Sequence, residues 1–272
     1  MTDPAPFHSA FYKFVALDAP DAVVDHLRLL TADLLGSILV AEEGINGMVA
    51  GSLAQLDAFE AALQTDARFG NKFCGITFKR SPCTTQPFRK MKVRRKPEIV
   101  PLGIDGVDAT KAGGIDVSPA DWRELIASDD VVLLDNRNSF EFRLGHFQRA
   151  IDPLVTNFRD FPAYVKAHAD EWKASGKRVA MYCTGGIRCE KTSVWMKDLD
   201  LPVYQLEGGI LNYFKAMPDA EKDWQGECFV FDNRVALDTK LNETATTVED
   251  VYANEPDGAW RLARAKRLDE AP

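Results

Sequence analysis

The sequence has few residues of the types that build disulfide frameworks and metal centres. It holds five cysteines, an odd number, at positions 74, 83, 183, 189 and 228, and none of them forms a C-x-x-C pair. Histidine occurs four times in 272 residues. This spacing indicates neither a disulfide scaffold nor a zinc site. We therefore expect no metal ligands in the functional site.

Long apolar runs are missing as well. No uninterrupted apolar segment approaches the roughly 20 residues that cross a bilayer, and residues 1–10 have neither the basic start nor the apolar core of a secretory signal. These absences predict a soluble, cytoplasmic protein with no membrane partner. The net charge of −8 disfavours a nucleic-acid partner when it is taken as an average over the surface.

One segment departs from this acidic average. Residues 79–96 contain no Asp or Glu, and Phe88 lies among their cations. Uncompensated cations within a Debye length of about 10 Å repel one another, and cations beside an aromatic ring are typical of RNA-binding surfaces. We expect the segment to bind RNA, although a strand edge kept basic against aggregation is the alternative. Its cations are Lys79, Arg80, Arg89, Lys90, Lys92, Arg94, Arg95 and Lys96.

The chain is longer than a typical single domain, which predicts two domains. Residues 1–102 show strand and helix patterns in the order β-α-β-β-α-β, with the last strand over Phe73 to Lys79. That order is typical of a ferredoxin-like α+β sandwich. Gly44 and Asn46 are expected to form the turn between the two central strands, because both residues tolerate positive φ.

A segment rich in Gly and Asp, residues 103–117, predicts a linker. Ser118 then caps a helix that has Pro119 in its first turn. Strand patterns alternate with helices from there on, which indicates a parallel sheet covered on both faces. We expect an α/β catalytic domain over 118–225 and a C-terminal extension over 226–272. The expected strands are Val131 to Asp135, Arg178 to Cys183 and Val203 to Leu206, and one expected helix is Phe161 to Ala174.

Cys183 lies at the end of one of these strands and before a helical pattern that runs from Cys189 to Leu199. The intervening residues are Thr184, Gly185, Gly186, Ile187 and Arg188. Two glycines let the backbone curl so that several N–H groups can point at one centre, and the helix start adds positive potential. Such a cradle stabilises a thiolate, and Arg188 adds a cation. The pattern predicts Cys183 as a nucleophile with Arg188 supporting the loop, rather than a small buried apolar residue.

Cys189 lies six residues beyond Cys183, at the start of the same predicted helix. It could serve as a resolving thiol, or it could pack into the core as a small apolar residue. The distance between the two sulfur atoms depends on the curvature of the loop, which spacing alone does not fix.

The cysteine loop resembles the active-site loop of the rhodanese superfamily. Residues 135–150 match that superfamily's D-x-R-x-x-x-E-[YF]-x-x-G-H-[IF]-x-x-A signature, and Leu206-Glu207-Gly208-Gly209 is a third match. Related phosphatases have five residues between Cys and Arg, whereas this chain has four. The resemblance therefore implies rhodanese-type chemistry and argues against phosphatase activity.

A more specific resemblance covers residues 9 to 238. Ala41-Glu42-Glu43-Gly44-Ile45-Asn46-Gly47, Arg89-Lys90-Met91-Lys92-Val93-Arg94 and Phe229-Val230-Phe231-Asp232-Asn233-Arg234, together with the cysteine loop, resemble the TrhO (YceA-like) family of rhodanese-domain tRNA uridine hydroxylases. The resemblance implies oxygen-dependent 5-hydroxylation of the wobble uridine, position 34, and tRNA bound through its anticodon arm. Molecular oxygen would be the co-substrate.

No organic cofactor or metal site is evident from the sequence, although oxygen chemistry on a pyrimidine normally uses iron or flavin. A persulfide or an oxidised form of Cys183 is one way to carry the reaction. Two alternatives remain: a sulfurtransferase that carries sulfur as a Cys183 persulfide, and a non-catalytic RNA-binding protein with a degenerate rhodanese domain. An intact Cys183 disfavours the latter, and the resemblance over residues 9–100 favours hydroxylation over sulfur transfer.

Overall fold

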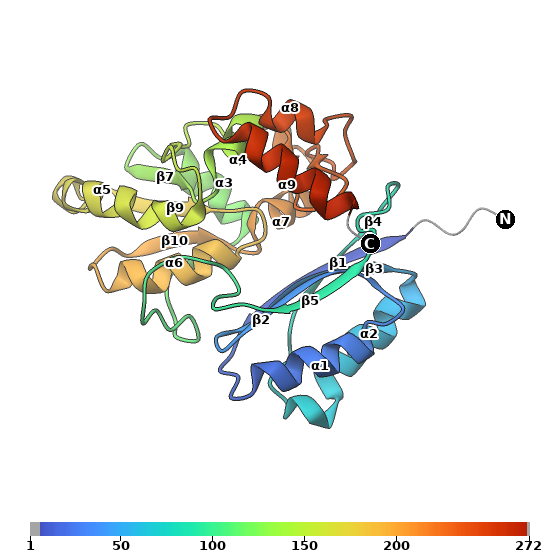
Figure 1. The fold of residues 1–272 in the computed structure, drawn as a ribbon. Coiled ribbons are helices and arrows are strands. Elements are labelled where there is room, and N and C mark those ends of the chain that lie inside the picture. Colours follow the sequence, from blue (N-terminus) through green and yellow to red (C-terminus); the bar gives the residue numbers. More distant parts are fainter. Residues whose placement is uncertain (1–5, 271–272) are drawn as a thin grey trace. The chain divides into compact units, whose positions relative to one another are not determined.

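The computed structural model describes residues 6–270, with side chains described up to residue 266 (Figure 1). Within this range the chain forms two compact units. The first ends at Pro101 and also includes Asp232–Arg234, and the second comprises Leu102–Phe231 and the residues from Val235 onward. Every helix in the described part of the chain is too short or too polar to cross a lipid bilayer.

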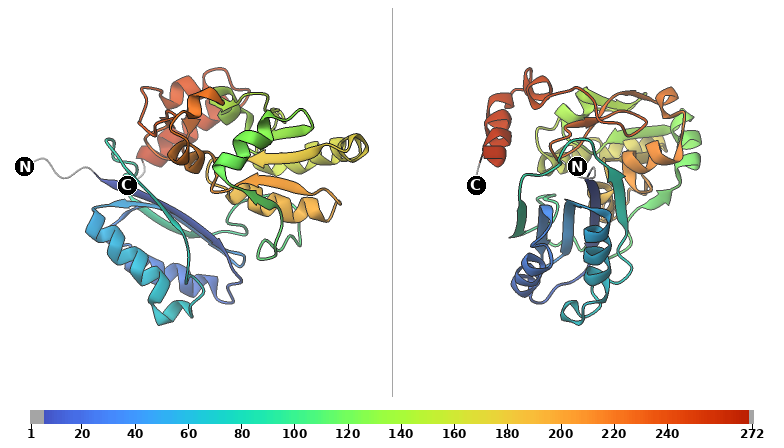
Figure 2. Two further views of the ribbon diagram at one scale, coloured as in Figure 1. Left: turned by 180° about the vertical axis from the view of Figure 1, so that it is seen from behind. Right: turned by 90° about the vertical axis from the view of Figure 1, so that its right-hand side faces the viewer.

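The first unit is a five-stranded sheet with two helices on one face (Figures 1 and 2). Its strand order is β4-β1-β3-β2-β5, in which β5 pairs parallel with β2 and the other neighbours are antiparallel. Its elements are β1 (Phe7–Phe14), α1 (Pro20–Leu30), β2 (Leu35–Ala41), β3 (Gly44–Gly51), α2 (Leu53–Thr65), a 3-10 turn η1 (Ala67–Phe69), β4 (Phe78–Pro82) and β5 (Met91–Arg95).

Alternation along the strands explains why the helices cover one face. Phe11, Ile38 and Val49 point toward α1 and α2 and form a common core with Leu27 of α1 and Leu56 of α2. Helix α2 begins with a capping box, in which the Ser52 hydroxyl accepts from the N–H of the residue three positions on. The predicted ferredoxin-like order is thus confirmed, with β5 as an additional edge strand.

Two local predictions in this unit were wrong. Phe73 and Ile76 are buried in a series of turns, and the strand β4 begins only at Phe78. The turn between β2 and β3 is formed by Glu42 and Glu43, because Ala41 pairs directly with Gly44. Asn46 instead lies inside β3, where its side-chain amide donates to the carbonyl of Ile99 at 3.0 Å.

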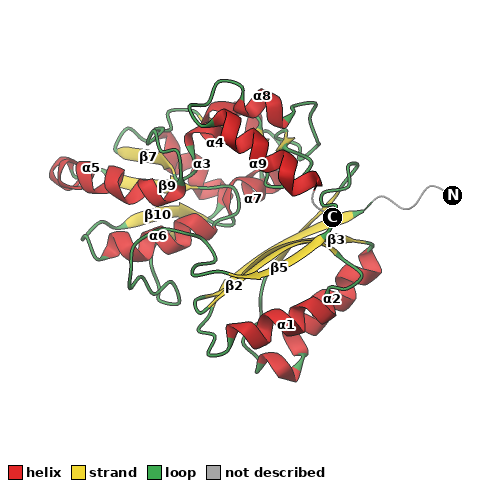
Figure 3. Ribbon diagram, viewed as in Figure 1, coloured by secondary structure: helices red, strands yellow, loops and turns green. Residues whose placement is uncertain are grey.

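The second unit is built around a parallel four-stranded sheet in the order β6-β10-β9-β7, and Figure 3 distinguishes its strands from its helices. Its elements are β6 (Ile115–Val117), α3 (Pro119–Ala127), β7 (Val131–Asp135), α4 (Ser139–Leu144), β8 (Gly145–Phe147), η2 (Phe158–Asp160), α5 (Phe161–Ser175), β9 (Arg178–Tyr182), α6 (Ile187–Lys197), β10 (Val203–Leu206), α7 (Gly209–Ala216), η3 (Ala220–Lys222), β11 (Trp224–Gly226), β12 (Cys228–Phe229), β13 (Ala236–Leu237), α8 (Val248–Tyr252) and α9 (Gly258–Glu270).

The predicted parallel sheet is confirmed, and its main core is aromatic. Trp122, Phe147, Tyr182, Tyr213 and Trp224 are buried together, and Phe147 meets three of the other rings edge-on at centroid distances of 4.8 to 5.1 Å. Edge-to-face contacts of this kind fix ring orientation as well as burying area. The carboxyl ends of β7, β9 and β10 are thereby held at one edge of a rigid sheet.

A smaller core joins the C-terminal part of the chain to α4. Phe140 of α4 packs against Phe229, Val235 and Val251. Tyr252 at the end of α8 contacts the Phe140 ring at a centroid distance of 5.2 Å. Apart from Asp232–Arg234, the residues after β11 therefore fold as part of the second unit and support the helix that follows β7.

Candidate active site

Cys183 directly follows β9, and the helix α6 begins at Ile187 after a tight turn. Gly186 occupies the N-cap position with φ +100°, a backbone conformation that favours glycine because other residues are strained there. The sequence pattern predicted this strand, loop and helix arrangement. Cys183 is almost fully buried, whereas Thr184, Gly185 and Ile187 are partly exposed.

Backbone amides converge on the Cys183 sulfur. The N–H of Gly186 donates to Sγ at an N···S distance of 3.2 Å. Burial by itself would raise the pKa of Cys183. The thiol of Cys189, the charge of Arg188 and the backbone N–H groups of both residues outweigh burial, so the pKa lies well below its ordinary value. These groups thus favour the charged form of the Cys183 thiol at the carboxyl end of β9.

The carbonyl groups of the same loop point the other way and are bound by α7. The N–H groups of Ile210 and Leu211 donate to the carbonyls of Cys183 and Thr184 at 3.0 and 3.2 Å. Gly209 makes this contact possible, because its φ is +73° and a Cβ there would lie 2.5 Å from the Cys183 carbonyl oxygen. With its carbonyls held outward by a helix start, the loop presents its amides to the sulfur.

Arg188 is held by a fully buried carboxylate, Glu141 of α4. Two guanidinium nitrogens donate to the two carboxylate oxygens at 2.7 and 2.8 Å, and one of them also donates to the hydroxyl of Thr184. Burial raises the pKa of Glu141, but the charge and hydrogen bonds of Arg188 outweigh it, so the net direction is downward. A bidentate pair therefore fixes the cation beside Cys183.

The sequence predicts no role in the site for Glu141, which is one residue of the rhodanese-like signature. Its position six residues after Asp135, in a signature with a fixed acidic residue, was the signal that could have identified it. Gly209, in the Glu207-Gly208-Gly209 match, was missed in the same way.

Cys189 lies in the first turn of α6 and is buried. Burial raises the pKa of its thiol, and donation to the Cys183 sulfur raises it further. The side-chain amide of Asn136, which follows β7, donates to Thr192 at 3.0 Å and reaches the Cys189 sulfur at 3.9 Å. The two cysteines are thus brought together, with the pKa of Cys183 lowered and that of Cys189 raised. All five cysteines are free of disulfides.

Asp135 and His146, which the signature also contains, make contacts that indicate a structural role. Asp135 is fully buried and accepts three hydrogen bonds from the Arg137 guanidinium at 2.6 to 3.1 Å. The His146 ring stacks on Phe142 with a centroid distance of 3.8 Å. Both residues order the turn after β7 and the start of β8.

The eight cations of residues 79–96 lie on or next to two different strands. Lys79 and Arg80 belong to β4, at one edge of the first unit's sheet, while Lys92, Arg94 and Arg95 belong to β5 at the other edge. Arg89 and Lys90 precede β5, and Lys96 follows it. The assumption that all eight charges are uncompensated was wrong. Arg80 pairs with Asp57 and Glu60, and Arg95 pairs with Asp21 and Glu42.

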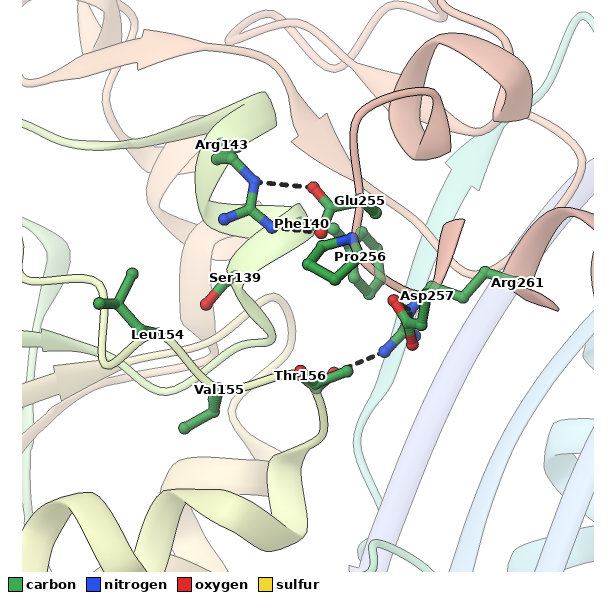
Figure 4. Close-up of a pocket in the computed structure, with 10 residues that line it drawn as sticks. All are labelled: Ser139, Phe140, Arg143, Leu154, Val155, Thr156, Glu255, Pro256, Asp257 and Arg261. Carbon is green, nitrogen blue, oxygen red and sulfur yellow. Dashed lines mark hydrogen bonds and ion pairs between the residues drawn. The ribbon is translucent and has the colours of Figure 1, made fainter. Parts of the chain in front are cut away.

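The second unit also contains a cavity of about 190 Å³, formed between α4 and the segment that leads into α9 (Figure 4). Ser139, Phe140 and Arg143 of α4 line one side. Glu255, which pairs with Arg143, and Arg261, which donates to the Thr156 carbonyl, line the other. Helix α4 therefore contacts Arg188 through Glu141, and other residues of the same helix line this cavity. Within residues 6–266, no group of three or more His, Cys, Asp or Glu side chains is arranged to hold a metal ion.

Comparisons with known proteins divide the chain in a similar way. Residues 8–99 match the UPF0176 acylphosphatase-like domain, and residues 118–216 match the rhodanese-like domain. A relative from Legionella pneumophila, named tRNA uridine(34) hydroxylase, is 40% identical over 250 residues, which cover 91% of this chain and 96% of the relative. A relative of the same name from Nitrobacter winogradskyi is 46% identical over 239 residues, 87% of this chain and 93% of the relative.

Proposed function

The chain belongs to the tRNA uridine(34) hydroxylase family, and from this premise we propose that the protein hydroxylates the wobble uridine of tRNA at C5, with molecular oxygen as co-substrate. The observation that carries the proposal is the cradle around Cys183 at the carboxyl end of β9, in which backbone amides and the Arg188 guanidinium, held by Glu141, lower the pKa of the thiol. A thiolate in such a cradle is a nucleophile poised at neutral pH.

Within this proposal Cys183 is the nucleophile that activates the base. Addition of the thiolate to C6 of uracil would move electron density onto C5 and the adjacent carbonyl, which makes C5 reactive toward an oxidant. Loss of the C5 proton and of the thiolate would later restore the ring double bond. Arg188, held by Glu141, keeps the thiolate charged, and Thr184, Gly185, Gly186 and Ile187 form the loop that surrounds it.

The electron balance assigns a role to Cys189. Conversion of uridine and O₂ to 5-hydroxyuridine and water consumes two electrons and two protons. Oxidation of two thiols to one disulfide supplies both. We propose Cys189 as the resolving thiol that supplies them together with Cys183, and an external thiol as the reductant that restores the pair. The hydrogen bond between the two side chains supports this assignment over a purely structural role.

We also propose that the basic segment binds the anticodon arm of the tRNA. Arg94 and Lys96 are exposed cations on or next to β5 and are the first choice for phosphate contacts, and Arg89 remains part of the proposed surface. Arg80 and Arg95 contribute less, because carboxylates within the first unit already pair with them. Lys79, Lys90 and Lys92 remain part of the proposed surface.

The direct test is a reconstituted reaction. It contains purified protein, tRNA with uridine at position 34, an external thiol and isotopically labelled O₂. We expect nucleoside mass spectrometry to find one labelled oxygen on C5 of that uridine. Cys183→Ser should give none while unfolding at a similar temperature, since oxygen for sulfur is nearly isosteric. Full modification of the uridine by a well-folded Cys183→Ser variant would contradict the proposal that Cys183 is the nucleophile.

Sulfur transfer through a Cys183 persulfide is the second candidate, because a buried cradle of amides suits a persulfide anion as well as a thiolate. Deletion of the gene separates the two. Hydroxylation predicts the loss of nucleosides derived from 5-hydroxyuridine at the wobble position while thiolated nucleosides persist. The reverse pattern would favour the sulfurtransferase.

A further inference from the structure

Phe231 is an exposed aromatic side chain beside the cysteine loop. It is 50% exposed, whereas Phe229, two residues earlier, is buried. The centre of the Phe231 ring lies 5.9 Å from the guanidinium carbon of Arg188. Because Arg188 closes the loop and its charge stabilises the Cys183 thiolate, Phe231 is an exposed ring in contact with the group that activates the nucleophile.

The ring is also held in place. It meets the Phe229 ring edge-on at a centroid distance of 5.0 Å, with an interplanar angle of 88°. Phe229 in turn belongs to the small core with Phe140, Val235 and Val251. A buried neighbour on one side and a cation on another restrict the ring, so that its exposed surface is presented in a fixed orientation.

We propose that Phe231 stacks on the uracil base that is modified. This inference rests on the function proposed above and adds a substrate-binding residue to it. A base taken out of a single-stranded loop loses its stacking neighbours, and RNA-modifying enzymes replace them with aromatic side chains. A phenylalanine offers a flat surface of similar width to a pyrimidine. Its place next to Arg188 would hold the base beside the loop that carries Cys183.

Trp260 provides a matched control. It is 51% exposed and carries an arginine, Arg264, at 5.4 Å from its ring, but it lies on α9 rather than beside the cysteine loop. Among the exposed large apolar side chains of residues 6–266, these two are the aromatic ones. Removal of either ring deletes an exposed aromatic group that contacts an arginine. Only the removal of the Phe231 ring is expected to affect the reaction.

Steady-state kinetics with tRNA form the first test. Loss of one base–aromatic stack typically weakens binding by about tenfold to a hundredfold. Phe231→Ala should raise KM by that factor and change kcat little, since stacking binds the ground state and the transition state alike. Phe231→Trp should restore KM. Trp260→Ala should match the wild type. The salt dependence of binding should not change in any variant, because no phosphate contact is removed.

A binding measurement keeps the test independent of activity. An anticodon stem-loop RNA with 2-aminopurine at the target position should lose fluorescence on binding to the wild type, to Phe231→Trp and to Trp260→Ala, but not to Phe231→Ala at saturation. If the wild type quenches the probe and yet hydroxylates no uridine, the proposed function fails and the stacking role stands. If hydroxylation occurs and Phe231→Ala changes neither KM nor quenching, the stacking role is wrong. Absence of any RNA binding would overturn both.

Discussion

At the scale of single residues, the chemistry depends on the ionisation of Cys183. Burial favours the neutral thiol, and the fold reverses this with the Cys189 thiol, the Arg188 charge and backbone amides. These donors cannot relax toward water, because the loop carbonyls are fixed by the first residues of α7. The lowered pKa is thus a property of the folded loop. A free cysteine has a pKa of about 8.5.

We predict that the ultraviolet absorbance of this thiolate titrates well below the pKa of a free cysteine. Cys183→Ser provides the baseline, and Cys189→Ala should raise the pKa because it removes a donor. The depressed pKa adds stability that is fully present above the unfolded pKa and is lost as pH falls through the folded one. The wild type should therefore gain stability over Cys183→Ser toward alkaline pH. If Cys183 titrated like a free cysteine, the loop would not lower the pKa of its thiol, and the prediction would be wrong.

The Glu141–Arg188 pair allows a prediction of stability. Glu141→Gln leaves a buried guanidinium without its counter-charge, and removal of one partner of a buried pair costs about 3–5 kcal/mol. Denaturant titration at neutral pH measures this cost. Because the pKa of Glu141 is lowered in the fold, its contribution is present above the unfolded pKa and should be lost as pH falls through the folded one.

Glu124→Gln is the control for that measurement, since Glu124 is exposed on α3. Substitutions at such surface positions usually change stability by less than about 0.5 kcal/mol. Equal effects of the two substitutions would mean that the buried pair contributes nothing beyond surface charge.

At the scale of elements, the sequence was most informative where a buried strand is bounded by turn or cap residues. The ranges of β7 and β10 were predicted to the residue, and the Ser118 cap of α3 is confirmed. The strand expected over Phe73 to Lys79 failed, because Gly75 has a φ of +73°, in the left-handed region, and residues 71–75 form turns. Phe73 and Ile76 are apolar because they belong to the core that α1 and α2 share with the sheet, a tertiary reason that a local pattern does not reveal.

Local patterns did not reveal the strand β5 for the same reason, and the signature that contains Glu141 did not reveal its contact with Arg188. Strand β5 exists through parallel pairing with β2, more than fifty residues earlier in the chain, and Glu141 meets Arg188 across two elements. Short-range patterns predicted the cysteine loop because its glycines, thiol and helix start are contiguous. Groups that reach the site from elsewhere in the chain require the tertiary structure.

The contact between the cysteine loop and α7 can be tested at Gly209. Gly209→Ala combines a positive φ with a Cβ that would lie 2.5 Å from the Cys183 carbonyl oxygen. Gly176→Ala introduces a similar positive φ, +65°, where a Cβ would meet nothing within 4 Å. We expect Gly176→Ala to cost about 1–2 kcal/mol and to leave activity unchanged. Gly209→Ala should cost more and also raise the pKa of Cys183, as measured by thiolate absorbance. Equal effects of the two would mean that the close approach does not position the loop.

At the scale of the whole molecule, an acidic protein is proposed to bind a polyanion. The net charge of −8 repels RNA at long range, so binding has to depend on local cations that release counterions from phosphates. The ion pairs of Arg80 and Arg95 show that part of the basic segment serves the first unit itself. Exposed Arg94 and Lys96 are the positions where charge is available for a partner.

We therefore predict that Arg94→Ala and Lys96→Ala each weaken tRNA binding and lower the slope of log affinity against log salt concentration by about 1, the change expected for one lost phosphate contact. The double variant should lower it by about 2, because separate phosphate contacts add. Lys177→Ala removes an exposed cation of the second unit and should leave the slope unchanged. A salt titration by fluorescence anisotropy measures the four variants and the wild type. If the slope does not respond to Arg94 or Lys96, the basic segment is a solvated strand edge, and the phosphates must be bound elsewhere on the chain.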